Sequence, residues 1–264
     1  MRQVEWKAQF TVALKVNELM SHVTDAEIAD SAWRGLYRIG GVTALIATVL
    51  LPAEVIVFGV LGLPPSTVID AFTLFHNNKL LGLLEFDLLG IVIYILLVPT
   101  LLALYVALRR ASASLMAIGT TFFFVGIAVY FATNTSFCML YLSDQYAAAT
   151  TDAQRSMFLA AGQAMFTMFN VTAFSFSYVI VSAALLIVAA VMLRSTIFSR
   201  ATAHAGILAN ALAIGSIAVA LIPLTFSLTI SVFLSLFSIV PLLIWFALIG
   251  RRLFYLGEAS QEEM

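Results

Sequence analysis

The stretch LLGIVIYILLVPTLLALYVALRR, at residues 88–110, decides the fold. It carries no charge until its final Arg pair. A bilayer core about 30 Å thick needs roughly 20 helical residues, so the stretch has the length of a transmembrane helix. Its side chains do not alternate between apolar and polar, as those of a barrel strand would. We therefore predict a helix that spans a membrane.

The whole chain shares this character. Of its 264 residues, 62% are hydrophobic and 10% are charged, and the mean hydropathy is +1.04. About a quarter of the residues of a soluble protein are charged. Six apolar segments are long enough to span, near residues 39–62, 87–108, 115–142, 171–193, 203–222 and 226–249. The sequence predicts an all-α integral membrane bundle of six transmembrane helices.

The basic residues predict an orientation. All but two of the thirteen Lys and Arg residues lie in the N-terminal segment or follow spans two, four and six. The exceptions are Lys79 and Arg155. By the positive-inside rule, we expect a protein of the cell membrane with both termini in the cytoplasm. The net charge of −1 does not indicate a basic surface for binding nucleic acid. The lipid bilayer is the expected partner, because the chain has six apolar spans.

We divide the chain into three parts. Residues 1–32 form a cytoplasmic segment with an amphipathic helix and a capping pattern at Thr24 and Glu27. That helix lies on the inner membrane surface or docks a soluble partner. Residues 33–252 form the transmembrane domain, and residues 253–264 form an acidic cytoplasmic tail.

Short helices are predicted on the outer side of the bundle. The sequence LPPSTVIDAF, at 63–72, has two prolines and then Ser66 as a helix N-cap, and Thr151 caps a helix before span four. In span six, serines at spacings of four, four and three share one helical face. They are Ser227, Ser231, Ser235 and Ser238. We interpret this face as a close-packing surface, with a hydroxyl-lined solute path as the alternative.

Polar side chains from four spans fall near one depth. Counting 1.5 Å per residue from Arg38 places Glu54 about 24 Å into span one, where an unpaired carboxylate indicates a functional site. The other members lie near the outer ends of their spans: Glu85, Asp87, Asn134 and Asn170. The first two point about 200° apart, so at most one faces a given site. The cluster predicts an outward-facing polar pocket; the alternative is carboxylates among lipid headgroups, with Glu54 protonated or hydrogen-bonded.

Several other functions are disfavoured. Cys138 is the only cysteine, which excludes an internal disulfide and a thiolate metal cluster. His22 and His204 are predicted on the opposite side of the membrane from His76, so they cannot share a metal. No nucleophile–base motif is present, and the predicted midplane has no ionisable residue for charge-coupled transport. We expect no cofactor, and a membrane enzyme is the least supported class.

Several segments carry a family resemblance. They are RGLYRIGG (34–41), NNKLLGLL (77–84), LLALYVALRR (101–110), VGIAVYFATNTSF (125–137), LSDQYAAATTDAQR (142–155), MLRSTIF (192–198) and GILAN (206–210). Over roughly residues 33–252 the chain resembles the bacterial membrane family DUF4386, a domain of unknown function. The resemblance implies a six-helix membrane fold and no particular activity or functional residue.

Two classes of function remain after these exclusions. In the first, the protein is a binding or permeation module whose outer polar residues receive a small uncharged or cationic ligand. In the second, it is a structural or regulatory protein that acts through a membrane partner protein or a second copy of itself. The first class requires water to reach Glu54, whereas the second predicts a dry, packed Glu54.

Overall fold

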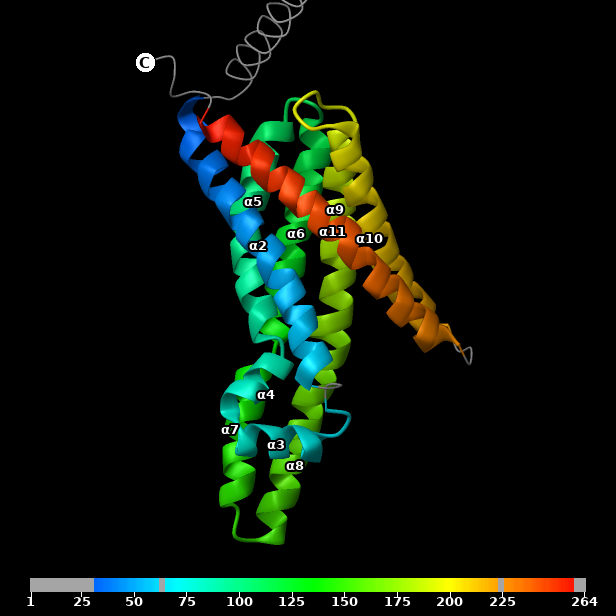
Figure 1. The fold of residues 1–264 in the computed structure, drawn as a ribbon. Helices are drawn as coiled ribbons and strands as arrows, with labels where there is room; N and C mark the ends of the chain where they lie inside the picture. Colours follow the sequence, from blue (N-terminus) through cyan, green and yellow to red (C-terminus); the bar gives the residue numbers. More distant parts are fainter. Residues whose placement is uncertain (1–30, 62–64, 223–225, 259–264) are drawn as a thin grey trace, which may run out of the picture.

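The structure is a computed structural model that describes residues 31–61, 65–222 and 226–258. This part of the chain is helical and contains no strand (Figure 1). Six of its helices are long and apolar enough to cross a membrane, which confirms the predicted all-α bundle. The protein is therefore a multi-pass membrane protein. The predicted N-terminal amphipathic helix and its Thr24–Glu27 cap lie outside the described residues.

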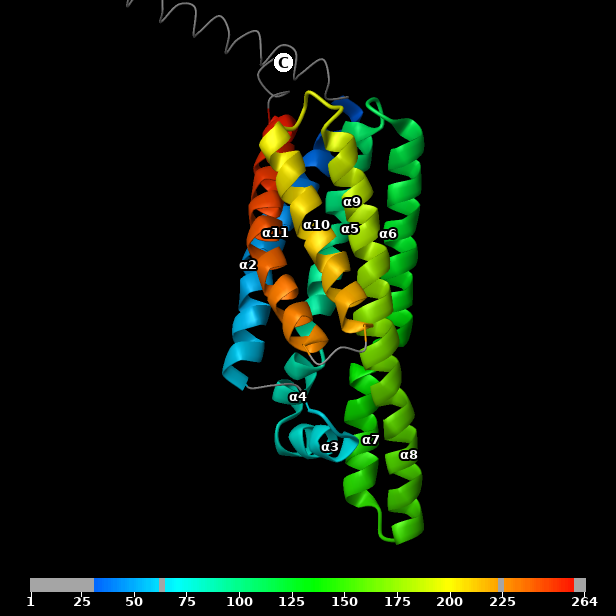
Figure 2. The same ribbon diagram turned by 90° about the vertical axis from the view of Figure 1, so that its right-hand side faces the viewer.

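The membrane-spanning helices form a closed ring. In chain order they are α2 (Arg34–Leu61), α5 (Leu88–Leu108), α6 (Ala113–Thr133), α9 (Ser177–Met192), α10 (Arg200–Ala220) and α11 (Ser227–Glu258). Each packs against the next, and α11 returns to pack against α2 (Figures 1 and 2). Trp245, Leu104 and Val188 are among the buried side chains at the centre. The first residues of the predicted acidic tail, 253–258, continue α11.

Helices α2 and α11 touch at one end of the ring and diverge toward the other. A Cβ atom on Gly41 would lie 2.5 Å from the backbone nitrogen of Phe254, and one on Gly250 would lie 3.1 Å from the carbonyl oxygen of Gly41. Only glycine permits backbones this close. We call this end, where α2 begins and α11 finishes, the terminal end. The two helices separate toward the opposite end in both views (Figures 1 and 2).

A helical appendage covers that opposite end. It consists of α3 (Val68–Asn77), α4 (Lys79–Glu85), α7 (Ser136–Ala148) and α8 (Asp152–Met168). Phe72, Phe75 and Phe86 are buried in its own apolar core, and Lys79 pairs with Asp144 at 2.7 Å across its surface. The α8–α9 run of 41 residues, Asp152–Met192, is about 60 Å long and so exceeds the bilayer core by about 30 Å.

Helix boundaries in the appendage refine the sequence predictions. The predicted span 115–142 is interrupted after Thr133, where the Asn134 side-chain oxygen accepts the backbone N–H of Ser136 at 3.2 Å. The fourth predicted span begins inside a π-helix, η2 (Phe169–Phe176), that joins α8 to α9. Thr151 caps α8, as predicted, and the structure adds a reciprocal capping box with Gln154.

One predicted cap is wrong. Thr67, and not Ser66, is the N-cap of α3. Its hydroxyl oxygen accepts the Asp70 backbone N–H at 3.1 Å and donates to the Asp70 carboxylate at 2.7 Å. Both residue types cap well, so the register of the turn decides between them.

Candidate functional site

The six spanning helices enclose a cavity of about 280 Å³ on the side of the ring that faces the appendage. Its lining along α5 runs from Asp87, just before that helix, to Leu97 at the helix midpoint. This stretch is about 15 Å long, which is roughly half the thickness of the hydrocarbon core. The cavity lies where α2 and α11 diverge, so their divergence provides the space.

All six spanning helices contribute to the walls. The apolar lining includes Leu51, Val55, Ile93, Leu97, Phe174, Val181, Leu185, Ile217, Ile239, Leu242 and Phe246. The polar lining consists of Glu54, Asp87, Tyr94, Tyr130, Tyr178, Ser182, Asn210, Ser235 and Ser238. Apolar walls with a few convergent polar groups are the usual composition of a small-molecule site.

A pair of carboxyl groups marks one end of the cavity. Glu54, on α2, lies beside Asp87, which immediately precedes α5, and both line the cavity. Two carboxylates this close cannot both be ionised without a compensating charge, so the pair shares a proton when it is unliganded. Among the described residues that line the cavity there is no Lys, Arg or His to supply that charge.

The backbone of Asp87 is held in an unusual conformation. Its φ of 67° and ψ of 37° are left-handed, and it is the one non-glycine residue with positive φ in the described part of the chain. A side chain on Gly90 would collide with the Asp87 carboxylate, so this glycine leaves room for it. Such strain persists only where the surrounding structure fixes it, and it is concentrated at functional sites.

Two further side chains orient this carboxylate. The Tyr130 hydroxyl, on α6, donates to Oδ2 of Asp87 at 2.5 Å, and the Asn134 amide nitrogen donates to the Tyr130 oxygen at 3.1 Å. The other carboxylate oxygen, Oδ1, is buried and accepts no hydrogen bond from a fixed protein donor. Asp87 is only 4% exposed, so this oxygen is an unsatisfied acceptor at the edge of the cavity.

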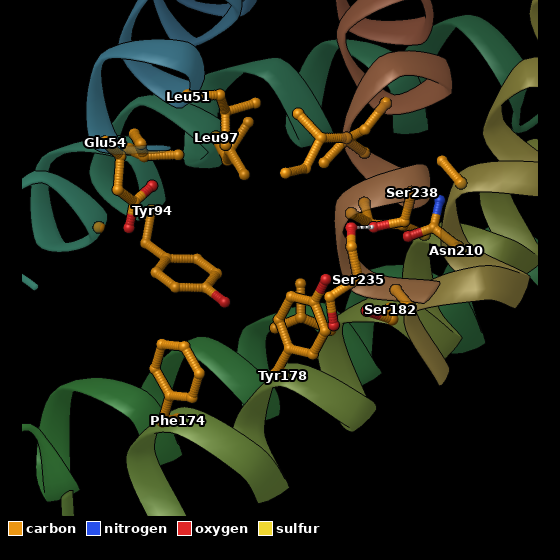
Figure 3. Close-up of a pocket in the computed structure, with 18 of the residues that line it drawn as sticks. Leu51, Glu54, Tyr94, Leu97, Phe174, Tyr178, Ser182, Asn210, Ser235 and Ser238 are labelled. Carbon is orange, nitrogen blue, oxygen red and sulfur yellow. Dashed lines mark hydrogen bonds between the residues drawn. The ribbon is translucent and has the colours of Figure 1, made fainter. Parts of the chain in front are cut away.

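Neutral polar groups mark the opposite side. Asn210 on α10 and Ser235 and Ser238 on α11 lie across the open space from Glu54 and Tyr94 (Figure 3). The Tyr94 hydroxyl points into that space (Figure 3). Ser238 donates its hydroxyl to the Ser235 carbonyl oxygen at 2.6 Å. The cavity therefore has an acidic end, an apolar middle and a neutral polar end.

The structure divides the five residues of the predicted polar cluster. Glu54 and Asp87 meet at the cavity, and Asn134 reaches Asp87 through Tyr130. Glu85 does not line the cavity; it is 5% exposed, its Oε2 is without a hydrogen-bond partner, and burial raises its pKa. Asn170 is exposed on η2 and donates to the Phe166 carbonyl oxygen at 3.0 Å.

Sequence reasoning did not assign the tyrosines and Asn210 to the site. Tyr94, Tyr130 and Tyr178 come from three separate helices, and tyrosine is common at membrane boundaries for reasons unrelated to ligands. The serine face of span six was interpreted as a packing surface, yet Ser235 and Ser238 line the cavity. The spacing of the serines in the sequence had also suggested a hydroxyl-lined solute path as the alternative, and the positions of Ser235 and Ser238 fit that alternative.

The site offers binding groups and no catalytic constellation. The described residues contain no group of three or more His, Cys, Asp or Glu side chains placed to hold a metal ion. Cys138 is exposed on the appendage and does not line the cavity. No protein-family model matches the chain, and no curated protein or solved structure matches it either.

Proposed function

We propose that this protein is a small-ligand binding or permeation module of the cell membrane, with its site in the cavity between the six helices. The observation that carries the proposal is the carboxyl pair, one member of which has a left-handed backbone, facing a cavity of about 280 Å³ with largely apolar walls. Ionisable residues inside a membrane are costly, and proteins retain them mainly where they serve a function.

The same proposal includes an orientation. Basic residues in or beside the last or first turns of the spanning helices gather at the terminal end: Arg109, Arg110, Arg194, Arg200, Arg251 and Arg252. The positive-inside rule then puts this end in the cytoplasm and the appendage outside, so the cavity faces outward. Membership of the DUF4386 family is part of the proposal and rests on the segments quoted above.

Water access to the cavity tests the proposal. In a Cys138→Ser background, Ser235→Cys introduces a thiol on the cavity wall with little change in volume. Phe237→Cys introduces one on the same helix at nearly the same depth, but on the side of α11 that points away from the bundle, where Phe237 is 68% exposed. A charged methanethiosulfonate reagent modifies thiols in water and not thiols in lipid.

We expect the reagent to modify the Ser235→Cys variant at least about tenfold faster than the Phe237→Cys variant, because thiolate formation requires water. Both variants must be modified fully after denaturation, which controls for the presence of the thiol. Equal protection of both positions would contradict a hydrated site. It would favour the alternative, a structural or regulatory protein that acts through partner helices.

A further inference from the structure

We infer that the ligand of this cavity is an organic ammonium ion whose nitrogen binds between Glu54 and Asp87 and whose apolar body fills the space beyond. The inference rests on the proposed ligand-binding function. It depends on three features of the site: the charge of the acidic end, the unsatisfied oxygen of Asp87, and the aromatic walls.

The charge balance of the site is incomplete without a cation. The titratable groups that face the pair are Tyr94 from α5, Tyr130 from α6 and Tyr178 from α9, and each is neutral in its ordinary state. The polar side chains that the described parts of α10 and α11 present to the cavity are those of Asn210, Ser235 and Ser238, and none of them is titratable in the ordinary pH range. A buried carboxylate without a counter-charge is strongly unfavourable, so a ligand that carries a positive charge gains a large electrostatic advantage.

Hydrogen bonding favours an ammonium group in particular. Oδ1 of Asp87 has no fixed hydrogen-bond donor, apart from the proton of the carboxyl pair that a cation would displace, although its partner oxygen accepts the Tyr130 hydroxyl. An ammonium group has three N–H donors and no acceptor. It can donate to Oδ1 of Asp87 and to Glu54 at the same time, and charge-assisted bonds of this kind are stronger than neutral ones.

Aromatic rings surround the same end. The ring centroids of Tyr94 and Tyr130 are 4.4 Å apart, Phe174 lines the neighbouring wall, and Tyr178 lies farther along the cavity beside Ser235 (Figure 3). Aromatic faces attract cations, and they do so most strongly where water is excluded. A carboxylate pair beside several aromatic rings thus suits an alkylammonium better than a neutral molecule.

The shape of the cavity argues against a bare metal ion. Its volume of about 280 Å³ and its largely apolar walls leave most of the space without oxygen ligands, whereas hard cations need six or more. Asn210, Ser235 and Ser238 lie across the cavity from the acidic end (Figure 3). They can bind a neutral polar group at the far end of the same ligand.

Three probes of one shape test the inference on the purified full-length protein. They are 4-phenylbutylamine, 4-phenylbutanol and 4-phenylbutanoate, with affinity measured by calorimetry in lipid nanodiscs. We expect the amine to bind at least about tenfold more tightly than the alcohol, and the carboxylate not to bind. Amine affinity falls as the pH is lowered, because protons compete for the carboxyl pair, whereas alcohol affinity does not change.

Variants of single carboxyl groups show which of them cause the preference for the amine over the alcohol. We expect Glu54→Gln to lower the affinity for the amine until it no longer exceeds the affinity for the alcohol. Glu85→Gln is the matched control, because Glu85 is a buried carboxyl group outside the cavity, and we expect it to bind the amine normally. Asp87→Asn repeats the test at the other carboxyl group, and the comparison of probes on the unmodified chain does not depend on any variant folding.

The outcomes separate this inference from the proposed function. Equal affinity for amine and alcohol would overturn the ammonium assignment and leave a ligand site. Absence of binding by all three probes, with the Ser235→Cys variant reactive, would also overturn the assignment but keep the hydrated cavity. An unreactive Ser235→Cys variant would remove the proposed function itself.

Discussion

Tyr130→Phe removes one hydroxyl group from the centre of the polar network. That hydroxyl donates to Asp87 at 2.5 Å and accepts from Asn134 at 3.1 Å. Tyr130 is 2% exposed, so only water in the cavity that Tyr130 and Asp87 line could replace the lost donor. The variant leaves the Asp87 carboxylate without its tyrosine donor, so that only Glu54 and the Gly90 backbone remain as its polar contacts.

The expected cost follows from these contacts. Hydrogen bonds to charged groups contribute about 1.5–3 kcal/mol in soluble proteins, but measured values within membranes average about 0.6 and reach about 1.7 kcal/mol. Because this bond is short, buried and charge-assisted, we expect a loss near the upper membrane value, about 1.5 kcal/mol. For a chain of this size that loss corresponds to a Tm about 3–6 °C lower.

Reversible unfolding by sodium dodecyl sulfate in mixed micelles measures this loss. The matched control is Tyr141→Phe, because Tyr141 is 62% exposed on α7 and its variant should stay within about 0.5 kcal/mol of the unmodified protein. The reasoning is refuted if Tyr130→Phe is as stable as Tyr141→Phe. In that case the hydroxyl would make no net contribution to the fold.

Three further predictions concern the rest of the structure. Gly41→Ala should destabilise the protein by about 1–3 kcal/mol, because the new Cβ would meet the Phe254 backbone. The control is Gly215→Ala, whose Cβ would meet nothing within 4 Å and which should be neutral or stabilising by up to about 1 kcal/mol. The same detergent titration compares the two variants. Glu85→Gln should raise the stability by about 1 kcal/mol at pH 7 and leave it unchanged near pH 4. Burial raises the pKa of Glu85 from 4.5, so the unmodified protein loses stability as the pH rises through that higher value. Thermal melts at both pH values measure the difference in stability between the two proteins, and a difference that does not change with pH would contradict the prediction. Thr151→Ala should cost about 1 kcal/mol by removing the α8 cap and should speed proteolysis between α7 and α8, whereas Thr167→Ala, in the middle of an exposed helical face, should not.

The sequence predicted the depth of polar groups better than their direction. A fixed rise per residue places Glu54 and Asp87 at similar depths whatever the packing. Direction around the helix axis is a different matter, because α5 is apolar on every side and has no polar face that shows which side turns inward. The inward position of Tyr94 therefore depends on how α5 packs against α2 and α9.

Local backbone geometry was the other limit. The left-handed conformation of Asp87 and the turn at Asn134 place two polar groups where a continuous helix would not. Asp and Asn favour such conformations only weakly, so their identity alone does not indicate where a helix is broken. Contacts that form only in the folded bundle, such as that of Tyr130 with Asp87, select the broken form.

Labelling of intact cells tests the central claim, a hydrated cavity that opens on the side of the bundle opposite the terminal end. The variant is Glu54→Cys in a Cys138→Ser background, and the reagent is a membrane-impermeant maleimide added from outside. The unmodified chain, whose exposed Cys138 lies on the appendage, is the positive control for sidedness. We predict that both thiols are labelled from outside; a Glu54→Cys variant that is folded, protected in cells and labelled only after denaturation would contradict the account.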